Sequence, residues 1–447
     1  MIKRFYQLLG IDRAIGTSSA NQLVRFFTAP VTMFLIIRYL SPEEQGFYYS
    51  FAGVVGIRVF LEAGFAVSIT QFAAKEFAGL HFNQNQVLTG NPENLSRLRS
   101  IFQKSSRYYS AMGIILSLGL AGGGHLFFSS KSSEVDWQIP WLVVSVCAGF
   151  QFLLTPFWAI LEGCDKVADV AIYRLGATII GFFAAALGLY ITQSIWVAVF
   201  GSVAGLLVAY GYIFLKWRKL LFQVKRKYYQ HQQVGWRREI WAFQWKVALS
   251  WVSNYIIGTA IPALVFAMAG AVAAGQVGMT IALVRTGGNI SSSWTATKMP
   301  RLASILAMGK FLEFEKVWRL AAYRSFFIAI IIQPSIVAGY FFLLYLLPGI
   351  ALRFTPPIET ILYAFGFIPL AIHVVLLHYT RASRGEPLLL ANVFTALLFL
   401  ILASILTQFY SSTGVALAFL ISQFFNLMLS LVYFNSYRLS LAEKHSI

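Results

Sequence analysis

Three arginines and one glutamate have the clearest chemical potential, because each lies inside a long apolar stretch. Arg58 and Arg285 are near the middle of such stretches, whereas Arg25 is closer to the end of one. Glu62 follows Arg58 by four residues, a spacing that puts both side chains on one face of a helix. A bare charge at the centre of a bilayer costs at least about 2.5–3.5 kcal/mol, so these residues must face protein, water or a partner.

The chemistry that these four residues suggest is the binding of an anion. Their summed charge is positive, and guanidinium groups hold phosphate oxygens in forked pairs of hydrogen bonds. We therefore predict a diphosphate site at Arg58, Arg285 and Arg25, with Glu62 as the charge partner of Arg58. The alternative is a structural ion pair between Arg58 and Glu62. That alternative leaves Arg285 without a carboxylate in its own helix.

No pattern in the sequence indicates catalysis. Nucleotide-binding, zinc-protease and Ser/His/Asp motifs do not occur, so we expect no enzyme activity, no cofactor and no metal. His373 and His378 share one apolar stretch and could titrate, but packing is the commoner role for a histidine inside a membrane. Cys147 and Cys164 are interpreted as small core residues.

The composition predicts an all-α integral membrane protein as the frame for these charges. Hydrophobic residues make up 58% of the 447 positions, charged residues only 12%, and the mean hydropathy is +0.68. A soluble domain carries about 25% charged residues. Stretches of about twenty apolar residues can cross the membrane, and about twelve are expected. They lie near 19–40, 47–70, 107–129, 139–161, 170–192, 195–215, 247–268, 276–297, 323–347, 358–380, 388–408 and 413–434.

The basic residues fix the expected orientation. Almost all of them fall in alternate loops, and only Arg38, Lys131 and Arg353 fall on the opposite side. Because cytoplasmic loops collect Lys and Arg, both termini are expected in the cytoplasm. The expected location is the inner (plasma) membrane. This orientation explains the net charge of +18, so we expect no nucleic acid as a partner.

Pairs of identical residues at one fixed separation predict an internal repeat. Pro30 and Pro262 are 232 residues apart, and so are Gly46 and Gly278. Two six-helix lobes in parallel orientation follow, with the matched prolines as bends where gating would occur. The expected layout is an amphipathic cytoplasmic segment, an N-lobe, a basic aromatic linker on the headgroups, a C-lobe and a cytoplasmic tail. Their ranges are 1–18, 19–215, 216–246, 247–434 and 435–447.

Several short motifs resemble those of the polysaccharide exporters of the MOP superfamily. They are Tyr39 to Phe51 (YLSPEEQGFYYSF), Glu62-Ala63-Gly64, Gln71 to Glu76 (QFAAKE), Ile160 to Gly163 (ILEG) and Arg381 to Glu386 (RASRGE). The resemblance implies two six-helix lobes around a V-shaped central cavity, working by alternating access. The sequence departs from the family at Ala269 to Gly278, where the proline-glutamate signature is missing.

Within that superfamily, the Wzx-type branch fits best. Its members flip undecaprenyl-diphosphate-linked oligosaccharides, such as O-antigen or exopolysaccharide units, to the outer leaflet. The related lipid II flippases carry cavity arginines in their first, second and eighth helices, and Arg25, Arg58 and Arg285 occupy similar places. Those flippases have helices thirteen and fourteen, which this sequence lacks.

The resemblance also implies binding partners, and two alternative functions remain to be compared with it. The expected partners are the lipid-linked oligosaccharide, membrane lipids, and a polysaccharide polymerase with its chain-length machinery, and the protein is expected to be a monomer. A multidrug antiporter of the same superfamily is the main alternative, although such proteins commonly use intramembrane acids. A membrane polymerase or ligase is a second alternative, but it would need a large external loop.

Overall fold

Long apolar runs form helices because backbone groups inside a bilayer must find their hydrogen bonds within their own segment. The structure is a computed structural model that describes residues 13–131, 134–226, 241–383 and 385–446. Most of the expected amphipathic segment 1–18 and the middle of the expected linker 216–246 therefore lie outside the described residues. Among the described residues, nine helices are long and apolar enough to cross a membrane. Two bent helix pairs raise that number to eleven.

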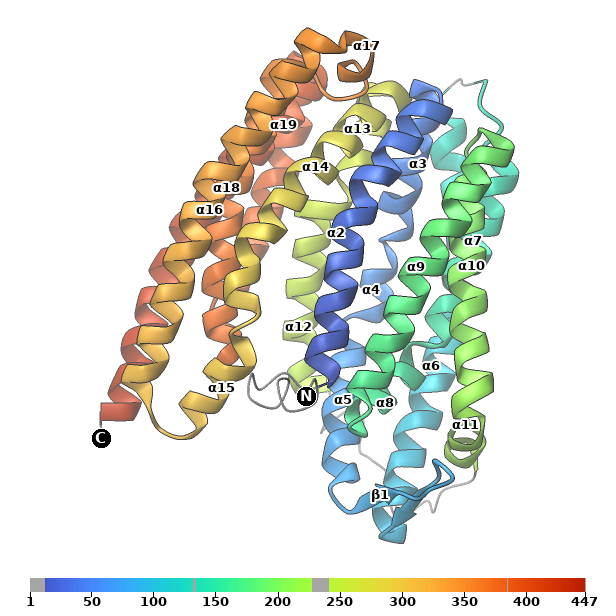
Figure 1. Cartoon of the computed structure of the whole chain (residues 1–447), viewed down its shortest axis with the longest axis vertical. Coiled ribbons are helices and arrows are strands. Elements are labelled where there is room, and N and C mark those ends of the chain that lie inside the picture. Colours follow the sequence, from blue (N-terminus) through green and yellow to red (C-terminus); the bar gives the residue numbers. More distant parts are fainter. Residues whose placement is uncertain (1–12, 132–133, 227–240, 384, 447) are drawn as a thin grey trace, which may run out of the picture. The chain divides into compact units, whose positions relative to one another are not determined.

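Contacts divide the chain into two compact units, and the first holds the described residues of Met1–Glu44 and Ile57–Ala248. Helix α2 packs on α9, α9 on α10, and α6 on α7, as can be followed in Figure 1. The elements of this unit are α2 (Arg13–Tyr39), α4 (Arg58–Glu62), α5 (Phe65–Phe77), β1 (Leu80–Phe82), β2 (Leu88–Gly90), α6 (Pro92–Ser129), α7 (Gln138–Leu153), α8 (Thr155–Gly163), α9 (Val167–Thr192), α10 (Val197–Tyr212), η1 (Ile213–Trp217) and α11 (Arg218–Lys225).

A small β-hairpin is hydrogen-bonded to the start of the expected linker. Strands β1 and β2 pair antiparallel, with Leu80 opposite Gly90. The side chain of Gln223, on α11, accepts from the Leu88 amide at 2.8 Å and donates to the Leu88 carbonyl at 2.6 Å. Trp217 is 1% exposed. Residues 216–225 therefore continue α10 and pack one face on protein, while Phe222 is 63% exposed. Their expected contact with lipid headgroups stays a prediction.

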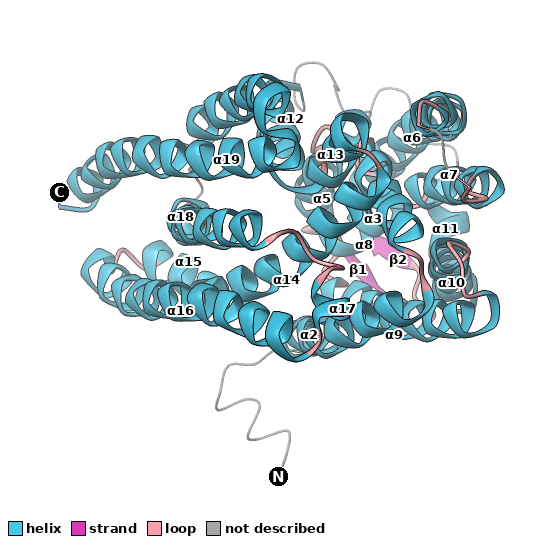
Figure 2. Cartoon of the chain, turned by 90° about the horizontal axis from the view of Figure 1, so that it is seen from above, coloured by secondary structure: helices cyan, strands magenta, loops and turns pink. Residues whose placement is uncertain are grey.

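The second unit holds Gln45–Gly56 and Leu249–Ile447 in their described parts. Helix α18 packs between α16 and α19 and also contacts α14, an arrangement visible from above in Figure 2. A non-helical residue, Ser411, divides α19 into two spans. The elements are α3 (Pro42–Val55) and α12 (Trp241–Asn254), which both begin in the first unit, η4 (Tyr255–Thr259), α13 (Ile261–Ala269), α14 (Ala271–Ala296), α15 (Met299–Ala307), α16 (Phe311–Leu346), α17 (Pro348–Ala351), α18 (Pro357–Ala382) and α19 (Leu389–Ser446).

The expected spans are all found as helices. Eleven of them correspond to the apolar helices and bent pairs. The remaining one, 276–297, is α14, which has 26 residues but also carries Arg285 and several amides and hydroxyls. An all-α membrane fold is therefore confirmed, while the repeat between two lobes stays a prediction.

The second span joins the second unit through a close backbone contact. A Cβ atom on Gly46 would lie 1.9 Å from the Ala271 carbonyl oxygen, so only glycine fits there. The neighbouring Gln45 amide donates to the Gly275 carbonyl at 2.9 Å. The ring of Phe47 packs edge-on against Phe266, with 5.0 Å between centroids. Gly46 thus serves close packing, which is the reason that a glycine opens this span.

Candidate functional site

Two spans are bent, and both bends have an arginine beside them. The segment Pro42–Glu62 meets Phe65–Phe77 at 46°, and Ala248–Thr259 meets Ile261–Ala269 at 52°. Broken helices expose backbone groups that must be satisfied by side chains, water or ligand. Interrupted spans are therefore good positions for a polar ligand in a membrane protein.

The first bend is made by left-handed backbone. Ala63 has φ 45° and Gly64 has φ 69°, a conformation that alanine rarely adopts. The Tyr108 hydroxyl donates to the Leu61 carbonyl at 2.6 Å and so satisfies an acceptor at the break. The Tyr108 ring also stacks on Phe65, with 4.7 Å between ring centroids. A neutral side chain from α6 therefore holds this bend.

Arg58 and Glu62 lie at the two ends of α4, the five-residue helix before this bend. Arg58 is exposed and Glu62 is half-buried. They are close enough to interact electrostatically, but within the described chain they form no ion pair. Arg58 also interacts with Tyr173, whose ring stacks flat on Trp158 at 4.0 Å. The arginine thus keeps its hydrogen-bond donors available beside an aromatic surface.

Arg25 and Pro30 lie on α2 of the same unit, and both are exposed. One turn before Arg25, the Asn21 side chain accepts from the Thr178 hydroxyl at 2.9 Å, which fixes α2 on α9. No interaction joins Arg25 to Arg58 among the described residues. Helix α2 continues through Pro30, so the first span carries its proline without a break.

The second bend is built around Pro262 and Arg285. Proline has no amide hydrogen, so the carbonyl four residues earlier, that of Gly258, loses its helical donor. Arg285 Nη2 donates to this carbonyl at 2.9 Å. Gly258 itself lies in η4, a short π-helical turn, which is typical of functional positions. The sequence-predicted gating proline and anion-binding arginine are therefore brought together at one backbone carbonyl.

Arg285 opens onto a pocket inside the second unit, with a cavity volume of about 240 Å³. The walls come from α12, η4, α13, α14, α18 and α19, and the polar groups are amides and hydroxyls: Asn254, Thr259, Asn289, Ser292 and Asn426. Arg285 carries the only charge among the lining residues, and no carboxylate pairs with it in the described chain. A site with one fixed cation and neutral donors suits an anionic group.

Sequence reasoning missed the neutral members of this pocket. Asn289 and Ser292 follow Arg285 by four and seven residues, so all three occupy one helix face. That spacing was a readable signal. Asn426 comes from a different helix, and nothing in the sequence places it at this wall.

The two histidines of α18 are held by neighbouring helices. His373 Nδ1 shares a hydrogen bond of 2.8 Å with the Ser430 hydroxyl, and His378 Nδ1 shares one of 2.8 Å with the Thr295 hydroxyl. His373 is 2% exposed. The Ser430 hydroxyl in turn donates to Asn426 at the pocket wall. The packing interpretation of both histidines agrees with these contacts.

A family model described as "Polysaccharide biosynthesis protein" matches residues 13–305 of the chain. No curated protein sequence is similar enough to match. Solved structures do match, and they cover almost all of the chain at low sequence identity.

One of these is the inward-facing conformation of a multidrug resistance MATE family transporter of the MOP superfamily. It has a TM-score of 0.65 at 13% identity, covering 97% of this chain and 99% of the other. The inward closed conformation of the lipid II flippase MurJ has a TM-score of 0.63 at 15% identity, covering 95% and 91%. A Vibrio cholerae MATE transporter has a TM-score of 0.60 at 12% identity, covering 96% and 97%. The chain thus has the fold of these membrane transporters and flippases.

Proposed function

The chain belongs to the polysaccharide biosynthesis protein family, and from this premise we propose that it flips an undecaprenyl-diphosphate-linked oligosaccharide across the membrane. The cargo is an O-antigen or exopolysaccharide repeat unit, carried from the cytoplasmic to the outer leaflet by alternating access. The protein acts in the inner membrane with both termini in the cytoplasm, and hands its product to a polysaccharide polymerase with its chain-length machinery.

The observation that carries this proposal is the unpaired charge of Arg285 in a neutral polar pocket. One hydrogen bond to the Gly258 carbonyl fixes the guanidinium, and its remaining donors have no carboxylate to satisfy them among the described residues. A diphosphate supplies oxygens in the geometry that a guanidinium prefers. The pocket volume of about 240 Å³ equals that of roughly eight water molecules, enough for a headgroup but not for an oligosaccharide.

The first unit contributes a second cationic position in this proposal. Arg58, helped by Arg25, meets the diphosphate with an exposed guanidinium, and Glu62 offsets the Arg58 charge when no substrate is bound. The flat ring pair of Trp158 and Tyr173 lies near Arg58 and offers an apolar face for a sugar ring. The bend at Pro262 and the unbroken helix at Pro30 are where the helices would flex as access alternates.

A multidrug antiporter is the second candidate, because transporters of that kind share the fold. Cationic drugs need an intramembrane acid, and the pocket of the second unit offers an arginine with neutral groups instead. That charge favours the flippase.

The test is translocation of a fluorescent undecaprenyl-diphosphate-linked oligosaccharide in proteoliposomes that contain the full chain. Arg285→Gln keeps a donor for the Gly258 carbonyl but removes the charge. A hydrogen bond to a charged group contributes about 1.5–3 kcal/mol, so we expect the initial rate to fall at least about tenfold.

Arg324→Gln is the matched control, because Arg324 is an exposed arginine of the same unit outside the pocket. Its rate should equal that of the unchanged protein. An undiminished rate in Arg285→Gln would overturn the diphosphate assignment. Resistance to cationic drugs in a sensitised host, with no translocation of the lipid-linked sugar, would favour the antiporter.

A further inference from the structure

A larger pocket lies on another face of α18, between α16 and α19. Its cavity volume is about 440 Å³. The floor and walls are apolar, and the rim carries two arginines, Arg319 and Arg438. The apolar side chains are Trp318, Ala322, Phe326, Ala371, Ile372, Val375 and Leu376. Its chemistry differs from that of the Arg285 pocket, since most of this surface suits a hydrocarbon chain.

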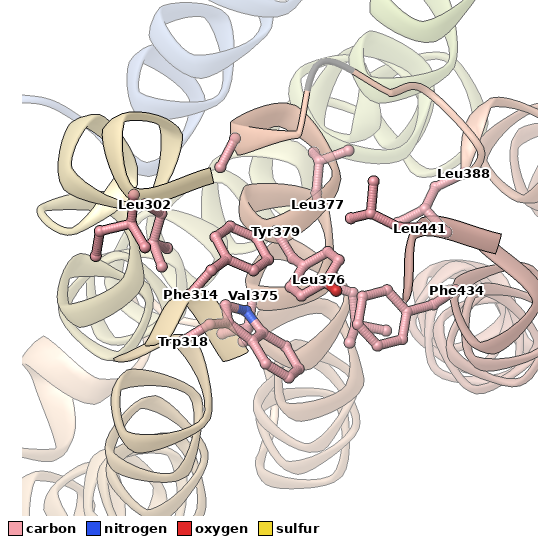
Figure 3. Close-up of a cluster of buried hydrophobic side chains, with 12 residues drawn as sticks. Leu302, Phe314, Trp318, Val375, Leu376, Leu377, Tyr379, Leu388, Phe434 and Leu441 are labelled. Atoms are coloured by element: carbon pink, nitrogen blue, oxygen red, sulfur yellow. The ribbon is translucent and has the colours of Figure 1, made fainter. Parts of the chain in front are cut away.

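A buried carboxylate holds the two rim arginines in place. Glu315 is 5% exposed at its side chain and accepts from Arg438 Nε at 3.0 Å and from Arg319 Nε at 3.3 Å. The Tyr379 hydroxyl donates to the same carboxylate at 2.6 Å. Figure 3 shows Tyr379 among the aromatic and aliphatic side chains that surround it, including Trp318 and Phe434. With two arginines and one glutamate, the rim keeps a net positive charge.

Two residues that line this pocket, Trp318 and Ser325, have polar atoms that are enclosed by protein. The Trp318 indole N–H and the Ser325 hydroxyl are both buried, at 7% and 1% exposure. Neither finds an acceptor among the described residues. Both residues therefore present apolar surface to the pocket.

The surroundings of the pocket are those of a membrane boundary. Neighbouring positions on α16 expose large apolar side chains, with Leu320 at 55%, Tyr323 at 63% and Phe327 at 60%. The same end of the unit collects basic residues: Arg301, Lys310, Lys316, Arg324 and Arg381. Apolar exposure beside a basic rim is typical of the level at which lipid headgroups meet acyl chains.

We propose that this pocket binds an anionic phospholipid, with its phosphate at Arg319 and Arg438 and an acyl chain along α18. The acyl chain covers the apolar floor, to which Trp318 and Ser325 contribute. Charge complementarity selects an acidic headgroup over a zwitterionic one. The site is separate from the proposed transport of lipid-linked sugars and concerns the lipid that surrounds the protein.

Native mass spectrometry of the purified full chain tests this proposal. The protein is titrated with phosphatidylglycerol and, separately, with phosphatidylcholine of the same acyl chains. One juxtamembrane cation contributes about 1 kcal/mol to the binding of acidic lipid, which corresponds to about fivefold in affinity. We expect the first phosphatidylglycerol to bind at least about fivefold more tightly than phosphatidylcholine, and Arg319→Gln to weaken phosphatidylglycerol by about fivefold.

A second variant fills the cavity. Ala322→Phe places a ring in the pocket and should weaken both lipids, while the exposed Ala338→Phe on the same helix should weaken neither. Arg324→Gln is the matched charge control for Arg319→Gln. Arg438 is left unchanged because its removal would leave Glu315 underpaired. A melting temperature for each variant separates loss of lipid from loss of fold.

Three outcomes would overturn the proposal: equal affinity for the two lipids, equal losses in Arg319→Gln and Arg324→Gln, or no loss in Ala322→Phe. A fourth arm uses undecaprenyl phosphate. If that lipid binds here more tightly than phosphatidylglycerol, the pocket belongs to the substrate path and the phospholipid assignment is wrong. The Arg285 transport assay is independent of all four results.

Discussion

The two bent spans solve the same backbone problem in different ways. At the first bend, left-handed residues turn the chain, and the neutral Tyr108 hydroxyl satisfies the Leu61 carbonyl. At the second, Pro262 interrupts the helix, and the charged Arg285 satisfies the Gly258 carbonyl. One bend therefore leaves the side chain of its arginine, Arg58, exposed. The other bend uses its arginine, Arg285, to satisfy a backbone carbonyl.

The two arginines therefore differ in how far the side chain can reach and in how well it is preorganised for a ligand. An exposed arginine retains its rotamers and can follow a ligand, but it loses entropy on binding. An arginine already fixed by one hydrogen bond has lost that entropy during folding and presents its remaining donors in a set direction. We expect Arg285 to define where the phosphate sits and Arg58 to tolerate more change.

The largest expected contrast concerns the backbone itself. Gly64→Ala puts a side chain at φ 69°, where the cost is about 1–2 kcal/mol. Gly258→Ala adds a Cβ at an ordinary 3.5 Å from Arg285 Nη2 and removes a helical glycine, a gain of up to about 1 kcal/mol. Thermal unfolding in one detergent should therefore give a lower melting temperature for the first variant and an equal or higher one for the second. Melting temperatures that fall equally would contradict the two mechanisms.

Lysine substitutions test preorganisation. A lysine at 285 has one ammonium and cannot bridge the Gly258 carbonyl and a phosphate in the forked geometry of arginine. We expect Arg285→Lys to slow translocation about tenfold and Arg58→Lys about threefold, because an exposed point charge still attracts the anion. The proteoliposome assay measures both rates. A greater loss in Arg58→Lys would reverse the roles assigned to the two arginines.

A third contrast uses two adjacent tyrosines. Tyr108→Phe removes the donor to the Leu61 carbonyl and should lower the unfolding free energy by about 1 kcal/mol. Tyr109→Phe removes a buried hydroxyl that has no partner among the described residues, so stability should stay equal or rise. Parallel thermal melts compare the two proteins. Equal destabilisation of both would mean that ring packing, not the hydrogen bond, holds the first bend.

Much of the fold was predictable because membrane helices follow local rules. Apolar length gave the spans, and the spacing of Arg58 and Glu62 placed them on one short helix. Pro262 marked the bend that the structure contains. Pro30 has the same chemistry, yet α2 passes through it, because neighbouring contacts rather than the proline alone decide whether a helix breaks.

The interactions between helices were not predictable. The hydrogen bond from Arg285 to Gly258 depends on which helix is the neighbour and how that helix is rotated. The apolar periodicity of the sequence predicts neither. The Glu315 cluster joins residues 123 positions apart in sequence. Short strands such as β1 and β2 also escaped, since three residues in a polar loop carry little periodic signal.

The Glu315 cluster has a consequence for the order in which the protein is made. Synthesis proceeds from the N-terminus, so Glu315 is in place long before the ribosome reaches Arg438. Until then, a carboxylate destined for burial lacks its main counter-charge, which is a destabilising state. A nascent chain that ends before Arg438 would hold this acid with Arg319 and Tyr379 but without its link to α19. The arrival of Arg438 thus completes the charge balance of this buried acid late in synthesis.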